Sequence, residues 1–212
     1  MDKSEKIWDK IADNYDKSEK RFEPIHKKTI ENTKKYLNST DIVLDYGCAT
    51  GTKALELASS VKRIQGIDIS SKMIEAAKRK AVERKIENVV FTHAIIFDER
   101  YKRESFDVIL AFNILHSLEG HKQVLKRINE LLKPGGLFIS VTPCLKEKMA
   151  IRNRLELSFF RLLIIIRVFP NILTRFKIPE LEDLITSGNF QIIETENIFH
   201  RMTSYFVTAK KI

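Results

Sequence analysis

The chain has 212 residues, and its 37 lysines and arginines against 28 aspartates and glutamates give a formal net charge of +9. This length suits one domain. Two cysteines, Cys48 and Cys144, are too few for a disulfide scaffold, and a composition of 43% hydrophobic and 31% charged residues excludes a disordered chain. The charged N-terminus does not resemble a secretory signal, and the longest apolar run, at 162–166, is too short to cross a bilayer. We therefore expect a cytoplasmic protein.

Hydrophobic periodicity predicts two leading helices, at 4–17 and 26–37, followed by strands that alternate with helices. The predicted strands lie at 42–44, 63–67, 89–91, 106–112 and 137–141, and the helices between them at 52–60, 71–82 and 121–132. Ser70 is placed to cap the helix whose inner positions are Met73, Ile74, Ala77, Ala81 and Val82. Pro134-Gly135-Gly136 is expected to end the helix at 121–132.

The C-terminal third predicts a long helix at 146–175, another at 179–187, and two closing strands at 190–196 and 203–209. The fold class is therefore α/β, doubly wound, with a mainly parallel seven-stranded sheet and an antiparallel last strand. An N-terminal helical lid and a helical insertion between strands five and six complete it.

The most informative stretch is the buried strand that runs into Asp45-Tyr46-Gly47-Cys48-Ala49-Thr50-Gly51 and then into a helix. Gly47 and Gly51 allow a sharp turn and a close ligand approach, and the helix start favours an anionic group. Asp68 follows the next strand, 21 residues beyond Gly47, near the spacing of an acid that binds ribose hydroxyls. Together these features predict a nucleoside site.

Two common nucleotide motifs do not fit this loop. A dinucleotide G-x-G-x-x-G would need glycine where Ala49 and Thr52 stand, and no Gly-Lys pair completes a phosphate-binding P-loop. NAD and ATP are therefore not favoured as ligands.

The chain resembles the class I S-adenosylmethionine-dependent methyltransferases, in the group that acts on small molecules and quinones. The resemblance covers roughly residues 40–143. It is carried by Leu44 to Gly51, Gly66 to Ser70, Ser105 to Ile109 and Leu131 to Gly136, in that order. The segment from Trp8 to Tyr15 is similar to the family's lid.

The resemblance implies S-adenosylmethionine as the cofactor and assigns its contacts. Asp45, Gly47 and Gly51 would surround the methionine end, Cys48 would also belong to the cofactor-binding residues, and Asp68 would bind the ribose. Ile69, His93 and Ala94 would lie at the adenine, and Asn113 beside the sulfonium and the acceptor. The sequence departs from the family at Ala49, where glycine is usual, and at His93, where an acidic residue often contacts the adenine amine.

By the same resemblance the chain forms one methyltransferase domain over 1–212. Residues 1–38 would be the lid, 40–143 the cofactor-binding core, 146–178 an apolar and basic insertion, and 179–212 the final helix and strands. Between Lys146 and Lys177 there are eight basic and two acidic residues, and apolar residues wrap the helix predicted around 155–169. The insertion could cover its own domain, act as a lid over an apolar acceptor, form a homodimer face, or make a peripheral membrane contact through 152–169.

Methyl transfer from a sulfonium requires mainly orientation and water exclusion, with a base only where the acceptor must lose a proton. The candidate catalytic residues are His116, which follows Asn113 in the acceptor loop, and Tyr15 in the lid. No spacing typical of metal ligands is present.

We therefore expect methyl transfer to a small, apolar acceptor. Nucleic acid is not favoured, because Asn113-Ile114-Leu115-His116 differs from the Asp/Asn-Pro-Pro-Tyr/Phe motif of base-amine methyltransferases. An RNA or protein methyltransferase, suggested by the net charge, and a non-catalytic cofactor-binding or membrane-associated scaffold remain the alternatives.

Overall fold

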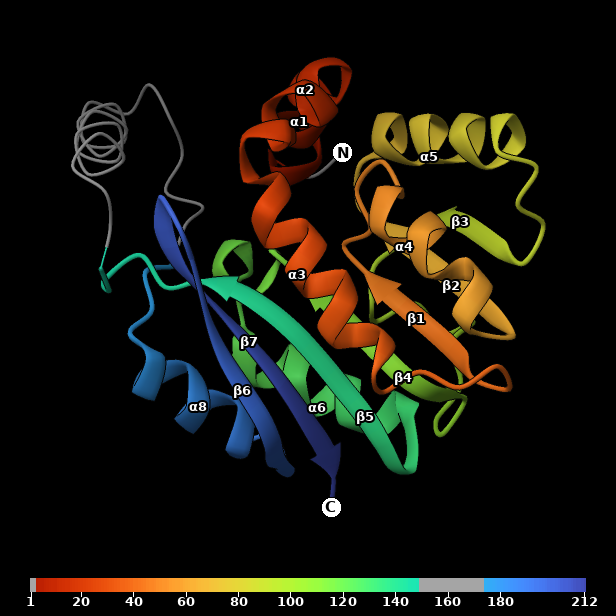
Figure 1. The fold of residues 1–212 in the computed structure, drawn as a ribbon. Helices are drawn as coiled ribbons and strands as arrows, with labels where there is room; N and C mark the ends of the chain where they lie inside the picture. The colour runs from red at the N-terminus through yellow and green to blue at the C-terminus, as the bar shows by residue number, and fades with distance from the viewer. Residues whose placement is uncertain (1–2, 149–173) are drawn as a thin grey trace.

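A computed structural model of the chain describes residues 3–148 and 174–212 (Figure 1). Seven strands form one sheet in the order β3-β2-β1-β4-β5-β7-β6. Their bounds are β1 Ile42–Tyr46, β2 Arg63–Asp68, β3 Val89–His93, β4 Phe106–Phe112, β5 Leu132–Pro143, β6 Phe190–His200 and β7 Met202–Lys211. The first five strands pair in parallel, whereas β7 runs antiparallel to both β5 and β6. This confirms the predicted fold class.

Helices cover both faces of the sheet. One face carries α3 (Glu23–Lys34), α4 (Thr52–Leu57) and α5 (Ser71–Glu83), and the other carries α6 (His121–Leu131) and α8 (Ile178–Thr186). Short 3-10 turns lie at Ala58–Ser60, after α4, and at Leu115–Ser117, after β4. Every helix within 3–148 and 174–212 is too short or too polar to span a bilayer.

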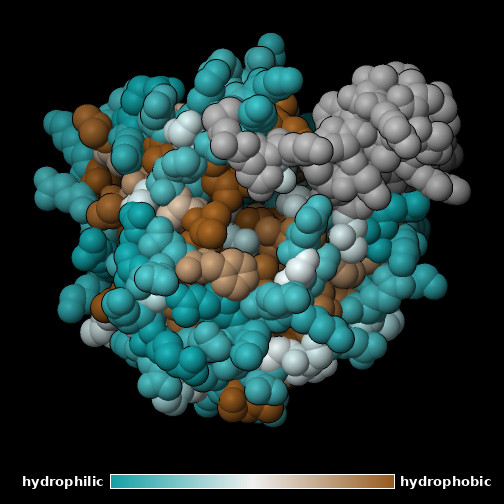
Figure 2. Space-filling view, turned by 180° about the vertical axis from the view of Figure 1, so that it is seen from behind, coloured by the Kyte–Doolittle hydropathy of each residue, from teal (hydrophilic) through white to brown (hydrophobic). Residues whose placement is uncertain are grey.

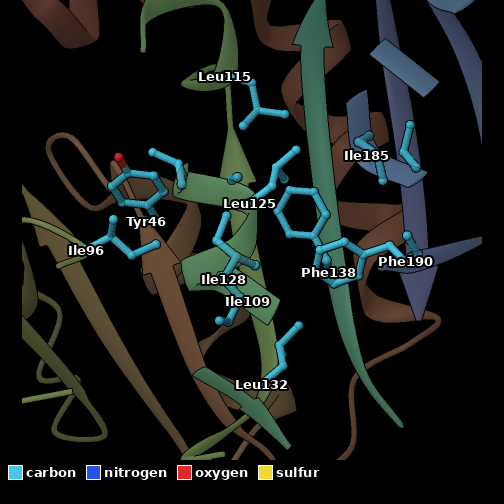
Figure 3. Packing of buried hydrophobic residues seen from close by; sticks show 14 of the residues in the cluster. Tyr46, Ile96, Ile109, Leu115, Leu125, Ile128, Leu132, Phe138, Ile185 and Phe190 are labelled. Carbon is cyan, nitrogen blue, oxygen red and sulfur yellow. The ribbon is translucent and has the colours of Figure 1, made fainter. Parts of the chain in front are cut away.

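The hydrophobic core is divided by the sheet into two clusters. Behind the sheet, Leu125 and Ile128 of α6 pack against Ile109 of β4 and Phe138 of β5, as Figure 3 shows. Helical spacing explains this packing, because residues three and four apart share one face of α6. In front, residues of α3, α4 and α5 pack on β1, β2 and β4.

The N-terminal segment divides into shorter helices than expected. The helix predicted at 4–17 is α1 (Lys3–Ile11), a 3-10 turn at Ala12–Asn14 and α2 (Tyr15–Glu19), and another 3-10 turn at Lys20–Phe22 leads into α3. Buried Ile25 and Ile30 place α3 in the core. Only the residues before α3 therefore lie above the carboxyl ends of the strands (Figure 1), and we call residues 3–19 the lid.

Two details of the predicted helices and strands are wrong. Helix α6 ends at Leu131, just before Pro134-Gly135-Gly136 as expected, but these three residues lie inside β5, which begins at Leu132 rather than at Leu137. The register with β4 shifts between Phe106 and Val108, and the extra residues of β5 form a bulge there. Val82, predicted on the inner face of α5, is 79% exposed. Each residue of a helix is rotated by about 100° from the one before it, so Val82 points away from the face on which Ala77 and Ala81 are buried.

The predicted insertion falls mostly outside the described residues, including the segment 152–169. At the ends of the helix predicted at 146–175, residues 146–148 and 174–175 are not helical. Figure 2 shows the face opposite to that of Figure 1, where hydrophobic residues gather around a central hollow and hydrophilic residues surround them.

Candidate cofactor site

A cleft of about 220 Å³ opens between the lid and the carboxyl ends of the central strands. Five of the residues singled out in the sequence line it: Tyr15, Gly47, Asp68, Ile69 and Asn113. Because β1 lies between β2 and β4, the loops that follow these three strands meet at this edge. The topology therefore brings together residues that are nearly one hundred positions apart.

The turn after β1 is held by its backbone. Gly47 and Cys48 donate their N–H groups to the carbonyl of Ile67, and Gly51 donates to the carbonyl of Cys48. Gly47 has φ +72°, and a Cβ there would collide with the side chain of Ile114. Glycine is thus required at Gly47 both by conformation and by space.

Asp68 connects the glycine turn to the start of α5. Its Oδ2 accepts from Ala49 N at 3.0 Å and its Oδ1 accepts from Ser70 N at 2.8 Å. Burial raises the pKa of Asp68, although these backbone hydrogen bonds oppose the shift. Ser70 caps α5 as predicted, accepting from Met73 N.

Tyr15 reaches the cleft from the lid. Burial of its hydroxyl, with the charges of Glu19 and Asp68, holds its pKa above the usual range. Tyr15 therefore keeps its proton at neutral pH, which suits a hydrogen-bond donor better than a base.

The other predicted site residues do not line the cleft within the described part of the chain. Asp45 is buried below the loop, and Cys48 lines a neighbouring cavity. Gly51 packs against Phe91. Ala94 donates its N–H to the carbonyl of Asp68 at 3.1 Å.

The two histidines have different surroundings. His93 is half exposed, with Nε2 2.9 Å from the carbonyl of Ile69 and 3.3 Å from Glu5 Oε1. Burial lowers the pKa of His116 to about 4, and its Nδ1 has no hydrogen-bond partner among the described residues. His116 is therefore neutral at pH 7, with a ring nitrogen free of such bonds.

No cofactor contact was assigned from the sequence to several of the lining residues. They are Ser4, Trp8, Tyr46, Ala49, Met73, Phe112, Ile114, Ser117, Leu118 and Glu119. Apolar residues among them lack polar chemistry, so only their positions after β1, after β4 or in the lid could have indicated a role. Trp8, as the one tryptophan of the chain and part of the lid motif, was the clearest signal.

Several known proteins that resemble the chain are methyltransferases. A methyltransferase domain family model matches residues 37–195. The chain is 33% identical over 102 residues to a 27-O-demethylrifamycin SV methyltransferase of Amycolatopsis mediterranei, covering 47% of this chain and 38% of that protein. It is 29% identical over 145 residues to a demethylmenaquinone methyltransferase of Lactococcus lactis, covering 65% and 57%. The chain thus spans about half or less of the length of these two curated relatives.

Among solved structures, a SAM-dependent methyltransferase of Methanosarcina mazei shares the fold, with a TM-score of 0.66 and 23% identity. The match covers 84% of this chain and 95% of that one. Since the family model spans residues 37–195, most of the chain, the chain belongs to the methyltransferase domain family, in the class I S-adenosylmethionine-dependent group.

Proposed function

We propose that the protein transfers a methyl group from S-adenosylmethionine to a small, apolar acceptor. The observation that carries this proposal is the cleft in which the glycine turn, Asp68 and the lid residue Tyr15 face one another. When bound, the cofactor supplies an activated methyl group on a sulfonium.

The residues of the cleft fit this cofactor. Each carboxylate oxygen of Asp68 accepts one hydrogen bond from a backbone N–H and keeps a second lone pair. The two oxygens can therefore also accept hydrogen bonds from two ribose hydroxyls. Ile69 and Met73 offer an apolar wall beside Asp68, suited to an adenine ring. The bare backbone of Gly47 lets the methionine end lie close to the turn.

The acceptor would lie beyond Asn113. Phe112, Ile114 and Leu118 contribute apolar surface there. Two relatives carry names that refer to a rifamycin and to a demethylmenaquinone, both small molecules, which favours an acceptor of the same kind.

The main contribution of the chain would be orientation and water exclusion, with the lid closing the cleft over the reacting groups. If the acceptor loses a proton, His116 has a neutral ring that could accept it, but burial lowers its pKa to about 4, which makes it a weak base, and it lies outside the lining of the cleft. Protonated Tyr15 would orient the reactants by donating a hydrogen bond.

An acceptor panel tests the proposal. The protein is incubated with S-adenosylmethionine and a demethylated quinol, a phenolic polyketide, RNA or a protein mixture, and formation of S-adenosylhomocysteine is followed. We expect turnover with an apolar small molecule that changes little between about 50 and 200 mM salt. Turnover with RNA alone, falling steeply with salt, would favour the alternative suggested by the net charge of +9.

A further inference from the structure

The hairpin of β6 and β7 turns at the same end of the sheet as the cofactor cleft. β7 runs antiparallel to β5, and Ser204, near its start, pairs with Pro143, the last residue of β5. Because the carboxyl ends of the parallel strands carry the cleft and the lid, the turn at 199–202 belongs to that end of the molecule (Figure 1). A surface on this turn therefore lies on the same side of the molecule as the cleft.

Phe199 presents an exposed aromatic ring on this turn. It is 55% exposed, more than any other phenylalanine that the structure describes. Its partner across the hairpin is Thr203, whose hydroxyl donates to the carbonyl of Lys148 at 3.0 Å. Since paired residues of neighbouring strands share one face of a sheet, Phe199 and the exposed Lys148 lie on the same face of the hairpin.

Two arginines complete this surface. Arg201 is the turn residue itself and holds φ +65°, a conformation that glycine adopts at much lower cost. Arg21 lies beside the turn, because its carbonyl is 3.1 Å from Nε2 of His200, and its guanidinium lies 4.9 Å from the centre of the Phe22 ring. We call Arg21, Lys148, Phe199 and Arg201 the tip surface.

The tip surface has an excess of positive charge. Glu19 and Glu23, the carboxylates nearest to Arg21 in the sequence, are each paired with a basic residue of α3 at 3.0 Å. No ion pair of Arg21, Lys148 or Arg201 occurs within 3–148 and 174–212. Cations around an exposed apolar ring are typical of surfaces that bind anionic lipid, because the cations attract the headgroups while the ring leaves water.

We propose that the tip surface binds the headgroups of an anionic lipid bilayer, with Phe199 entering the boundary between headgroups and acyl chains. This inference goes beyond the proposed function, but the two agree, because an apolar acceptor partitions into lipid and the tip surface lies on the same side of the molecule as the cleft. RNA would also attract the three cations. It fits less well, because single strands stack on several aromatic rings along a groove, whereas the tip surface offers one ring on a turn.

Sedimentation of the full chain with lipid vesicles tests the proposal without cofactor or acceptor. The vesicles contain phosphatidylcholine alone or an equimolar mixture with phosphatidylglycerol, and we expect at least about tenfold tighter binding to the mixture. Arg201→Gly removes one cation at a position that suits glycine, and it should weaken binding to the mixture about fivefold. Phe199→Ser should weaken it about fivefold as well, because the apolar ring is lost.

Matched controls change similar residues away from the tip surface. Ile193→Ser removes a side chain of β6 that is 50% exposed, and Lys62→Ser removes an exposed cation before β2, at the opposite end of the sheet. Both should bind the mixture within about twofold of wild type. Residues 149–173 are the same in every variant, so their contribution cancels in the comparison.

Thermal unfolding followed by circular dichroism shows that the variants are folded, and Arg201→Gly should melt no lower than wild type because glycine relieves the turn. Wild-type protein that ignores anionic vesicles, or wild-type affinity in both Arg201→Gly and Phe199→Ser, would overturn the proposal. Binding to single-stranded RNA without binding to vesicles would overturn it in favour of a nucleic acid. Vesicle binding as expected, together with no turnover in the acceptor panel, would instead count against the proposed function alone.

Discussion

At the scale of single residues, the glycine turn depends on backbone conformations that side chains seldom adopt. Gly47, Ala49 and Gly51 all have positive φ, and so does Asn113 at the facing loop. Ala49 holds φ +47° with a Cβ, a conformation that costs about 1–2 kcal/mol. The loop therefore has backbone strain at Ala49 and tight packing around Gly47 and Gly51.

Gly51→Ala should destabilise the protein by about 2–4 kcal/mol, because the new Cβ adopts a left-handed backbone and meets the Phe91 ring and the Ala77 methyl group. Chemical denaturation measures the free energy of unfolding. Ala49→Gly is the matched control and should leave that free energy unchanged or raise it by up to about 1 kcal/mol. Equal losses in the two variants would contradict this account of the turn.

Asp45 should make the stability of the unliganded protein depend on pH. Burial raises its pKa from 3.8 to about 7, with Lys53 opposing and Asp68 adding to the shift. The folded state then binds the proton more tightly than the unfolded state, so this contribution is present below pH 4 and is lost as pH rises to about 7.

Asp45→Asn removes that titration. At pH 8 it should raise the free energy of unfolding by an amount on the order of 2–4 kcal/mol relative to wild type, and at pH 4 the two proteins should be similar. Glu56→Gln, which changes an exposed carboxylate on α4, serves as the control. Parallel pH profiles for wild type and Asp45→Asn would show that Asp45 is not the titrating group.

At the scale of elements, the lid is attached to the domain by carboxylates. Asp9 Oδ1 accepts from Ser70 Oγ at 2.6 Å, and Asp16 Oδ1 accepts from Thr50 Oγ1 at 2.6 Å while its other oxygen pairs with Lys80. These contacts hold the lid over the starts of α5 and α4, on both sides of the cleft.

Asp16→Ala should loosen the lid and increase the dissociation rate of S-adenosylhomocysteine by about threefold to tenfold, because the contacts of a partly exposed ion pair contribute at most about 1 kcal/mol and a hydrogen bond adds to them. Stopped-flow displacement measures this rate. Asp13→Ala changes an exposed lid carboxylate for which no hydrogen bond is found among the described residues, and it should leave the rate unchanged. An unaltered rate in Asp16→Ala would mean that the lid is held by other contacts.

The elements also show where sequence reasoning succeeds. Long, strongly periodic segments such as α6 and the continuous apolar strand β4 were predicted closely, because their burial follows from local patterns. The bulge at Pro134-Gly135-Gly136 was not, because it depends on pairing with β4, which is distant in sequence. The break of the first predicted helix at Ala12–Asn14 was not predicted either. The neighbouring cavity that Cys48 lines was missed because its lining joins residues of the lid, the glycine turn and α5, which are far apart in sequence.

At the scale of the whole molecule, sheet order determines which loops can meet. The order β3-β2-β1-β4 places the turns after β1, β2 and β4 at one edge, and the lid lies above that edge. The glycine turn and Asp68 were predictable because a glycine turn after one strand and an acid after the next strand have the spacing that a nucleoside site requires. The apolar lining was not, since only the fold selects it.

Calorimetric titration with S-adenosylhomocysteine tests the central claim most directly. The account predicts a single site with a dissociation constant of about micromolar order in the wild-type protein. Asp68→Ala should weaken binding by about tenfold to a hundredfold while the protein remains folded, because it removes the acceptors for both ribose hydroxyls. No heat of binding in folded wild-type protein, or equal affinity in Asp68→Ala, would contradict the account.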